Sequence, residues 1–260
     1  MNTYTEAATT GGVAAPHRWR RVLPALVVGI VLAAGTLGAA AGTADATGKT
    51  YVVKAATQKM AGPHLTNYVQ KGTYAKGKRL SLSCYTWGQL VYGWGGRSNL
   101  WYYTSDGVYV ADVDIYTGTN NPVTRVCPKV SLAYFVADTR GKTWENIAGT
   151  YSGECVSLTS QYIWRVYGIK AAGTGWGNGI DYRYGRVTGN KLKSLGFKWS
   201  TNKSFKNGDI LVWNNGQWGH VGIYYNGKVF DQNDSRHSPA RTANYSGAPW
   251  ANGYLGRWSK

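Results

Sequence analysis

Cys155 stands where the sequence favours a reactive thiol. Apolar residues recur at helical spacing from Val156 to Tyr167, and Gly168 would end that helix. Ser152 is a candidate amino-terminal cap, which places Cys155 in the first turn. Unpaired backbone N–H groups and the helix dipole favour a thiolate there, so we expect a nucleophile. The alternative is a small buried helix residue, which is the usual place of a cysteine.

A thiol nucleophile needs a base, and His220 is the histidine best placed for that role. It falls in a predicted β-hairpin, whose strands at 209–213 and 218–225 are joined by a polar turn. Alternation puts Gly222 on the same face as His220, which leaves room for another group to approach the imidazole. His237 lies in a polar loop. The alternative for His220 is an ordinary strand histidine.

Asp231 and Asn233 are candidates for the group that orients the imidazole. They belong to a predicted strand at 228–233, which lies beside the His220 strand in a meander, and they alternate onto one face. Either side chain could accept the imidazole N–H and fix its tautomer. Asp231 would add charge stabilisation that an amide lacks. The alternative is two polar residues at a strand end.

A glycine-rich segment at 173–179 separates the nucleophile helix from the hairpin. It holds too many glycines for a regular element, and we expect a substrate-lining loop with Trp176 and Tyr182 facing the cleft. Trp218, close to the predicted base, is a third candidate for substrate contact. A plain surface loop is the alternative.

The first 46 residues are typical of an export signal. A basic block at 17–21 precedes the uncharged segment 22–42, and the run closes on Ala44-Asp45-Ala46. Cleavage after Ala46 would leave 26 basic and 10 acidic residues, a balance of +16. An uncleaved anchor is the alternative, because about 20 apolar residues can span a bilayer. We therefore expect a secreted, extracellular protein.

The composition limits which classes of binding partner and of catalytic site are plausible. The 260 residues include 29 Lys and Arg against 12 Asp and Glu, and charged residues make up only 16% against 43% hydrophobic ones, so the chain should fold. Few carboxylates argue against a paired-acid glycosidase and against calcium cages. The positive excess favours an anionic partner. Because the sequence has no zinc-finger spacing, phosphate-binding glycine loop or basic helix, we expect a wall or membrane surface and no nucleic acid.

The residues before about 130 predict a small all-β barrel or sandwich. Four short β-rich runs are separated by glycine or polar turns, at 78–82, 89–92, 99–103 and 107–112. Cys84 and Cys127 bracket these runs, and in an oxidising compartment such a pair usually forms a disulfide. No other Cys or His lies near enough to complete a metal site. Cys155 is then the odd thiol.

Five short motifs follow one another between residues 50 and 130. They are Ala61-Gly62-Pro63-His64, Val69-Gln70-Lys71-Gly72-Thr73, Leu82-Ser83-Cys84, Leu100-Trp101-Tyr102 and Gly107-Val108-Tyr109-Val110-Ala111-Asp112. In this order they resemble the bacterial SH3-like domains of secreted wall proteins. The resemblance implies a small barrel that binds the wall or serves as a spacer. The aromatic residues of this part are either barrel core and rim or an exposed platform for glycan or peptide.

Four further motifs occur in order in the second half of the chain. They are Gly153-Glu154-Cys155, Asn207-Gly208-Asp209-Ile210-Leu211-Val212, Trp218-Gly219-His220-Val221-Gly222-Ile223 and Phe230-Asp231-Gln232-Asn233. Over about residues 140–258 they resemble the CHAP family, the cysteine, histidine-dependent amidohydrolases/peptidases. The resemblance implies a papain-like α+β fold, with the cysteine helix first and an antiparallel sheet that carries the histidine, and hydrolysis of amide bonds in peptidoglycan.

The same resemblance implies a role for each site residue. It makes Cys155 the nucleophile, His220 the base, Asp231 the third group and Asn233 the amide that follows. Glu is common in the family where this chain has Asp231. The shorter side chain leaves the division of labour between Asp231 and Asn233 open.

The sequence predicts four segments. They are an export signal or anchor at 1–46, an SH3-like β-barrel domain at 47–130, a linker at 131–139 and a CHAP catalytic domain at 140–260. We expect a monomeric peptidoglycan hydrolase without metal or organic cofactor, either an N-acetylmuramoyl-L-alanine amidase or an endopeptidase of the stem peptide or cross-bridge. The expected partners are peptidoglycan and anionic wall polymers, and the membrane would be met only through an uncleaved amino-terminal segment.

Two other classes of protein are compatible with the same candidate residues. One is a non-enzymatic wall-binding protein in which Cys155 is inert. The other is an acyl transferase of the transglutaminase type, which uses a similar triad but passes the acyl group to an amine. Analysis of the products separates the two enzyme classes.

Overall fold

The computed structural model describes residues 48–170, 176–234, 241–247 and 252–260. The described residues all belong to one compact unit. The predicted export signal at 1–46 and the first part of the glycine-rich segment, 173–175, lie outside the described residues. Within the described residues, no helix is long and apolar enough to cross a membrane.

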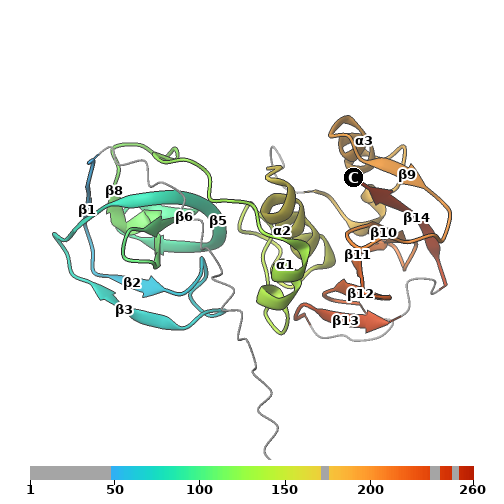
Figure 1. Cartoon of the computed structure of the whole chain (residues 1–260), viewed down its shortest axis with the longest axis horizontal. Coiled ribbons are helices and arrows are strands. Elements are labelled where there is room, and N and C mark those ends of the chain that lie inside the picture. Colours follow the sequence, from blue (N-terminus) through green and yellow to red (C-terminus); the bar gives the residue numbers. More distant parts are fainter. Residues whose placement is uncertain (1–47, 171–175, 235–240, 248–251) are drawn as a thin grey trace, which may run out of the picture. The chain divides into compact units, whose positions relative to one another are not determined.

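Residues 48–130, called the β region below, contain two antiparallel sheets and one 3-10 helix (Figure 1). The sheets have the strand orders β4-β1-β8 and β3-β2-β7-β6-β5. The elements are β1 (Tyr51–Val53), β2 (Thr57–Met60), β3 (Gln70–Tyr74), β4 (Arg79–Leu80), β5 (Leu82–Gly93), β6 (Gly96–Thr104), β7 (Tyr109–Ala111), η1 (Asp112–Asp114) and β8 (Ile115–Tyr116). The predicted β character is confirmed, although the run predicted at 89–92 is only the end of the long strand β5.

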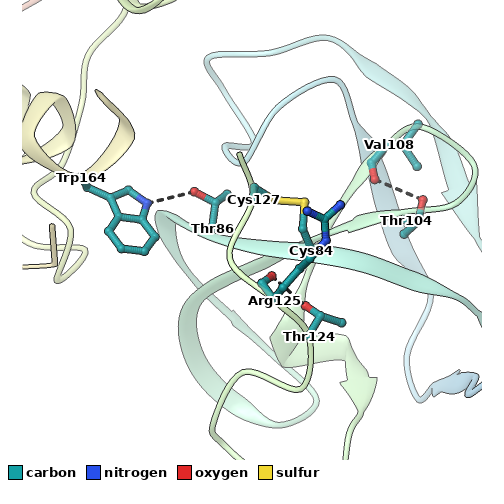
Figure 2. Close-up of a disulfide and its surroundings, with 8 residues drawn as sticks. All are labelled: Cys84, Thr86, Thr104, Val108, Thr124, Arg125, Cys127 and Trp164. Carbon is teal, nitrogen blue, oxygen red and sulfur yellow. Dashed lines mark hydrogen bonds between the residues drawn. A yellow bond between two sulfur atoms is a disulfide. The ribbon is translucent and has the colours of Figure 1, made fainter. Parts of the chain in front are cut away.

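Cys84 and Cys127 form the predicted disulfide (Figure 2). Backbone hydrogen bonds accompany it: Tyr85 N donates to Arg125 O at 2.9 Å, and Cys127 N donates to Tyr85 O at 2.8 Å. The segment around residue 125 therefore runs along β5. The bridge ties the segment that leaves the β region to the longest strand of that region.

Residues 131–260, called the α+β region below, combine helices with a six-stranded antiparallel sheet of order β13-β12-β11-β10-β14-β9 (Figure 1). The helical elements are α1 (Leu132–Thr139), α2 (Cys155–Tyr167), η2 (Gly179–Tyr182) and α3 (Val187–Ser194). The strands are β9 (Lys198–Ser200), β10 (Ile210–Trp213), β11 (His220–Tyr225), β12 (Lys228–Asp231), β13 (Asn244–Gly247) and β14 (Tyr254–Ser259). Leu158 and Ile163 of α2 share one buried core with Val221 of β11 and Phe230 of β12. This core fixes the helix against the two strands, in the α+β arrangement expected from the sequence.

The segment 131–139, expected to be a linker, is largely helical. The Ser131 side chain caps α1 by accepting a hydrogen bond from Tyr134 N at 3.1 Å. Phe135 and Val136 are buried in the same core as α2. A flexible linker would not bury such residues, so α1 belongs to the packed structure. The sequence interpretation missed this helix, which is only eight residues long.

Asp138 of α1 joins side chains from both regions. Tyr68 of the β region donates its hydroxyl to Asp138 Oδ2 at 2.6 Å, and Arg165 of α2 donates to the same oxygen at 2.6 Å. At another contact, Trp164 Nε1 donates to Thr86 Oγ1 at 3.2 Å (Figure 2). The helix that begins with Cys155 is therefore held by polar side chains of β5 and of the loop at residue 68.

Candidate active site

Cys155 is the first residue of α2, so it lies in the first turn as the sequence predicts, and its side chain is buried. The cap is Glu154, which corrects the expectation for Ser152. Gly153 causes the difference, since its φ of 79° turns the chain just before the helix and delays the first turn by two residues. Gly168 ends α2 in the left-handed conformation, with a φ of 72°, as predicted.

His220 begins β11 and Asp231 ends the neighbouring strand β12. His220 Nε2 lies 2.8 Å from Asp231 Oδ2, and both side chains are buried. Ser246 donates its hydroxyl to the same carboxylate oxygen at 2.6 Å. Since Nε2 is used by Asp231, Nδ1 is the ring nitrogen left for the Cys155 sulfur. The question left open by the sequence is answered: Asp231 is the residue that contacts the imidazole.

Gly222 makes the approach of Asp231 possible. A Cβ atom at Gly222 would lie 2.5 Å from Val229 Cγ1 and 3.1 Å from Asp231 Cβ. Real side chains do not pack that closely, so a larger residue would push β12 away from β11. The expectation that glycine leaves room beside His220 is confirmed, and the group that fills the room is Asp231.

The electrostatics favour a protonated imidazole. Burial alone would lower the pKa of His220, but the nearby Cys155 sulfur and the hydrogen bond to Asp231 outweigh burial and raise that pKa above its ordinary value. A charged imidazole and an anionic sulfur stabilise each other at short range. The arrangement therefore suits a thiolate–imidazolium pair that is oriented by a carboxylate.

Asn233 takes a different position from Asp231. It adopts a left-handed backbone, with a φ of 58°, and its Nδ2 donates to Glu154 Oε2 at 2.7 Å. Glu154 also pairs with Arg241. Asn233 thus bonds to the residue that precedes the nucleophile, whereas Asp231 bonds to the base. It still lines the cavity at Cys155.

A cavity of about 1040 Å³ opens over Cys155 and His220. Its lining is rich in neutral amide side chains: Asn146, Asn178, Asn214, Asn215, Gln217, Asn233 and Asn252. Trp218 lines it and is 60% exposed, and its role in substrate contact stays a prediction. Tyr151, which the sequence interpretation missed, also lines it and is 67% exposed.

The two aromatic residues expected in the glycine-rich loop differ from each other. Trp176 lines the cavity but is almost fully buried. Tyr182 is fully buried and does not line the cavity, contrary to the expectation that it faces the cleft. It packs against Trp176, with ring centroids 6.2 Å apart, and its carbonyl accepts a hydrogen bond from Trp258 Nε1. Burial and the nearby Cys155 sulfur raise the pKa of Tyr182 well above its ordinary value, so it stays neutral beneath the site.

Residues 144–233 match the family model of the CHAP domain. The chain contains a CHAP domain. The matched segment includes Cys155, His220 and Asp231, and it supports a hydrolase of the cysteine, histidine-dependent amidohydrolase type with peptidoglycan as the suggested substrate. A comparison with curated proteins found no match. The CHAP match does not reach the β region, so the SH3-like resemblance there stays a prediction.

Gln232 of the CHAP domain was missed by the sequence interpretation. This buried side chain donates through Nε2 to Trp144 O at 2.9 Å and to Glu154 O at 2.8 Å, and its Oε1 accepts from Trp144 N at 3.3 Å. It therefore fixes the end of β12 to the residue before Cys155. No sequence pattern could identify Gln232, because the backbone groups that it contacts are distant along the chain.

Asn146 is a second missed residue of the CHAP domain. It lines the cavity, and its Oδ1 accepts hydrogen bonds from Ala148 N at 2.9 Å, Thr150 N at 3.1 Å and Thr150 Oγ1 at 3.2 Å. These bonds fix the amide plane. Among the described residues Nδ2 has no hydrogen-bond partner, so the nitrogen is left as a donor beside the nucleophile.

Two glycines bring η2 against the start of β11. A Cβ atom at Gly179 would lie 2.6 Å from His220 N, and one at Gly219, where φ is 66°, would lie 2.6 Å from Ile180 N. Ile180 N donates to Trp218 O at 2.8 Å. The close approach fixes the backbone that carries the base.

One group of side chains in the described part of the chain could hold a metal ion. His220, Asp231 and Asp234 each bring a potential ligand atom within 4.8 Å of the others. Two of these atoms, His220 Nε2 and Asp231 Oδ2, already bond to each other. A cation would therefore have to displace the proton that orients the base, and the arrangement suits thiol chemistry better.

Proposed function

We propose that this protein is a secreted cell-wall hydrolase that cleaves amide bonds of peptidoglycan. One observation carries the proposal: the buried His220 is paired with Asp231, with 2.8 Å between Nε2 and Oδ2, and lines the same cavity as Cys155 at the start of α2. A nucleophile, a base and an orienting carboxylate are the groups that cysteine-dependent amide hydrolysis requires.

In the first step the Cys155 sulfur attacks the amide carbonyl carbon, and a C–S bond forms while the carbonyl π electrons move to oxygen. The first backbone N–H groups of a helix have no intrahelical partner, so those at the start of α2 would donate to this oxygen. Asn146 Nδ2, which has no partner within the described residues, would be a further donor on the cavity wall. Together they would stabilise the negative charge of the tetrahedral intermediate.

In the second step the C–N bond breaks. His220 gives its Nδ1 proton to the leaving amine, and a thioester to Cys155 remains. Water then attacks the thioester carbon while His220 accepts the water proton. The C–S bond breaks, the Cys155 thiolate is regenerated beside the protonated His220, and the acid product leaves as a carboxylate after losing its proton to solvent. Asp231 keeps the ring in one orientation throughout because its carboxylate holds the Nε2–H.

The cavity lining supports a peptide-bearing substrate. Asn and Gln side chains donate and accept hydrogen bonds, so they match the amide groups of a stem peptide or of an N-acetyl sugar. The exposed rings of Tyr151 and Trp218 offer apolar faces at the same cavity. The positive excess of the chain, with 16 basic and 6 acidic residues in 140–260, would draw it toward anionic wall polymers.

The other parts of the chain complete the proposal. Residues 1–46 would direct export, and the SH3-like resemblance of residues 47–130 would make the β region a wall-binding or spacer module ahead of the CHAP domain at 140–260. The protein would act outside the cell as a monomer, without nucleic acid as a partner.

The test is digestion of purified peptidoglycan by the wild type and by Cys155→Ala. We expect soluble fragments only with the wild type, and mass spectrometry of the new ends separates an amidase from an endopeptidase. Ser194→Ala, at the end of α3 and outside the cavity lining, is a matched control that should keep full activity. An unchanged wall after incubation with folded wild-type protein would contradict the proposal.

A further inference from the structure

A second cavity, of about 760 Å³, is lined mainly by the β region, with Ala148 and Thr150 from the α+β region, and it shares no lining residue with the cavity at Cys155. Trp87 of β5, Arg97 of β6, Asp112 of η1 and Tyr116 of β8 line it, and Trp94 lines it from the turn between β5 and β6. Two of these residues carry polar atoms whose hydrogen-bonding capacity is unused.

Asp112 supplies an unpaired acceptor. The residue is 9% exposed, and its Oδ2 accepts only a long hydrogen bond of 3.3 Å from Ser98 Oγ. Its Oδ1 is buried and has no hydrogen-bond partner among the described residues. Burial raises the pKa of Asp112 to about 6, against a smaller opposing effect of Ser98, so the carboxyl is still largely ionised at neutral pH. A buried carboxylate without a partner is unfavourable, and a cationic donor would offset that cost.

Trp87 supplies an unpaired donor to the same cavity. Its Nε1 is buried and has no hydrogen-bond partner in the described part of the chain. A carbonyl oxygen is the natural acceptor for an indole N–H. A ligand that offers both a cation and a carbonyl group would satisfy both unpaired atoms.

The aromatic wall already holds an ammonium group. The rings of Trp94 and Tyr116 meet edge to face, with centroids 6.3 Å apart, and each residue is 55% exposed. The Lys54 ammonium nitrogen lies 5.8 Å from the centroid of Trp94 and 5.1 Å from that of Tyr116. Such rings attract a cation and the methylene groups that carry it.

We propose that this cavity binds a peptide through a primary ammonium group that pairs with Asp112. A peptide carbonyl would accept from Trp87 Nε1, and the aliphatic stem of the amine would pack on Trp94 and Tyr116. Arg97 lines the cavity and makes no ion pair within the described residues, so a carboxylate next to the amine would find a partner there. The site goes beyond the proposed hydrolysis, because neither Cys155 nor His220 takes part in it.

The test is calorimetric titration of the full-length Cys155→Ala chain with N-acetyl-glycyl-lysine. Two control peptides keep the aliphatic part of the lysine side chain and lack its positive charge. In one the lysine amine is acetylated, and in the other norleucine replaces lysine. We expect both analogues to bind about tenfold more weakly or worse, as for the loss of a charged hydrogen bond. Equal affinity for the three peptides, or no heat of binding with any of them, would overturn the proposal.

Asp112→Asn tests the same contact from the protein side. We expect it to weaken lysyl-peptide binding to the level of the acetylated analogue, while its melting temperature stays equal to that of the parent chain or rises, because an unpaired buried charge is removed. Trp87→Phe should weaken binding less. Asp106→Asn, which changes an aspartate outside the cavity lining, should bind like the parent chain. A lower melting temperature with unchanged binding in Asp112→Asn would show a purely structural carboxylate and would refute the site.

A second series identifies the source of the peptide. Stem peptides from purified peptidoglycan replace the synthetic dipeptide, with and without acetylation of their free amines. Tighter amine-dependent binding than that of the dipeptide supports a wall ligand for this site. If stem peptides bind through their amines with the same affinity as the dipeptide, the site accepts lysyl peptides in general. Binding remains measurable even if the Cys155 chemistry fails, so the two proposals are tested separately.

Discussion

The Asp231 carboxylate accepts from His220 across two neighbouring strands, with 2.8 Å between Oδ2 and Nε2 and both side chains buried. Asp231 therefore decides which ring nitrogen faces Cys155. By contrast, Asn233, two residues later, bonds to Glu154 at the start of α2. Asp231, which ends β12, and Asn233, which follows it, therefore have different partners, and their substitutions should have different effects.

Asp231→Asn should lower kcat by about 10²- to 10⁴-fold, because an amide can present its N–H to the ring and select the wrong tautomer. Asn233→Ala should have a smaller effect, since it removes a contact to Glu154 rather than to the base. The measurement is the initial rate of fragment release from peptidoglycan with each folded variant. A larger loss in Asn233→Ala than in Asp231→Asn would show that the roles are reversed.

The pH dependence of kcat/KM should reflect the raised pKa of His220. The protonated imidazole persists above the ordinary pKa of histidine, so activity should hold through neutral pH and decline only as the pH rises through the raised value. Asp231→Asn removes one of the contributions that raise this pKa. Its alkaline limb should therefore lie at lower pH than that of the wild type, and an unmoved limb would contradict the assignment.

Gly222→Ala should weaken both fold and catalysis. The new methyl group would overlap Val229 and crowd Asp231, and overpacking of this kind costs about 1–3 kcal/mol of unfolding free energy. Chemical denaturation measures that loss, and fragment release measures the activity. The double variant Gly222→Ala/Val229→Ala relieves the 2.5 Å contact and should recover part of the stability. No recovery would show that the strain lies elsewhere.

Asp138 should be essential to the packing of α2. Arg165 lies largely buried beside it, and removal of one partner from such a pair costs about 3–5 kcal/mol. Asp138→Asn should therefore be strongly destabilised in denaturant, whereas Tyr68→Phe, which removes one hydrogen bond to the same carboxylate, should lose only about 1 kcal/mol. Equal stability of Asp138→Asn and the wild type would exclude this role.

The same carboxyl should contribute to acid sensitivity. Burial alone would raise the pKa of Asp138, but Arg165 and the hydrogen bond from Tyr68 outweigh burial and lower it. A lowered folded-state pKa contributes stability that is present above the unfolded-state pKa and is lost as the pH falls through the folded-state value. The stability of the wild type should fall more steeply in acid than that of Asp138→Asn.

The sequence predicted the parts of the site that lie within short local patterns. The apolar spacing of 156–167 and the position of Gly168 predicted the helix that carries Cys155. The predicted meander placed the strand of Asp231 beside the strand of His220. The Ser152 cap was wrong because Gly153 turns the chain before the helix begins.

Residues whose roles depend on distant backbone atoms could not be found in this way. Gln232 bonds to Trp144 and Glu154, which lie 88 and 78 positions away along the chain. The helix α1 was overlooked because eight residues give a weak periodic signal. Tyr182 follows a glycine-rich segment and was expected to face the cleft, but it is buried and packs against Trp176.

The central claim is that Cys155 hydrolyses an amide bond of peptidoglycan, and digestion in ¹⁸O-labelled water tests it most directly. Purified wall is incubated with the wild type and with Cys155→Ala, and the released fragments are weighed by mass spectrometry. The account predicts one ¹⁸O atom in each new carboxylate made by the wild type and no new carboxylate with the variant. A parallel digest contains an added primary amine. New amide links to that amine, without ¹⁸O, would indicate acyl transfer and contradict the account. Unaltered wall would indicate a binding protein and would contradict it too.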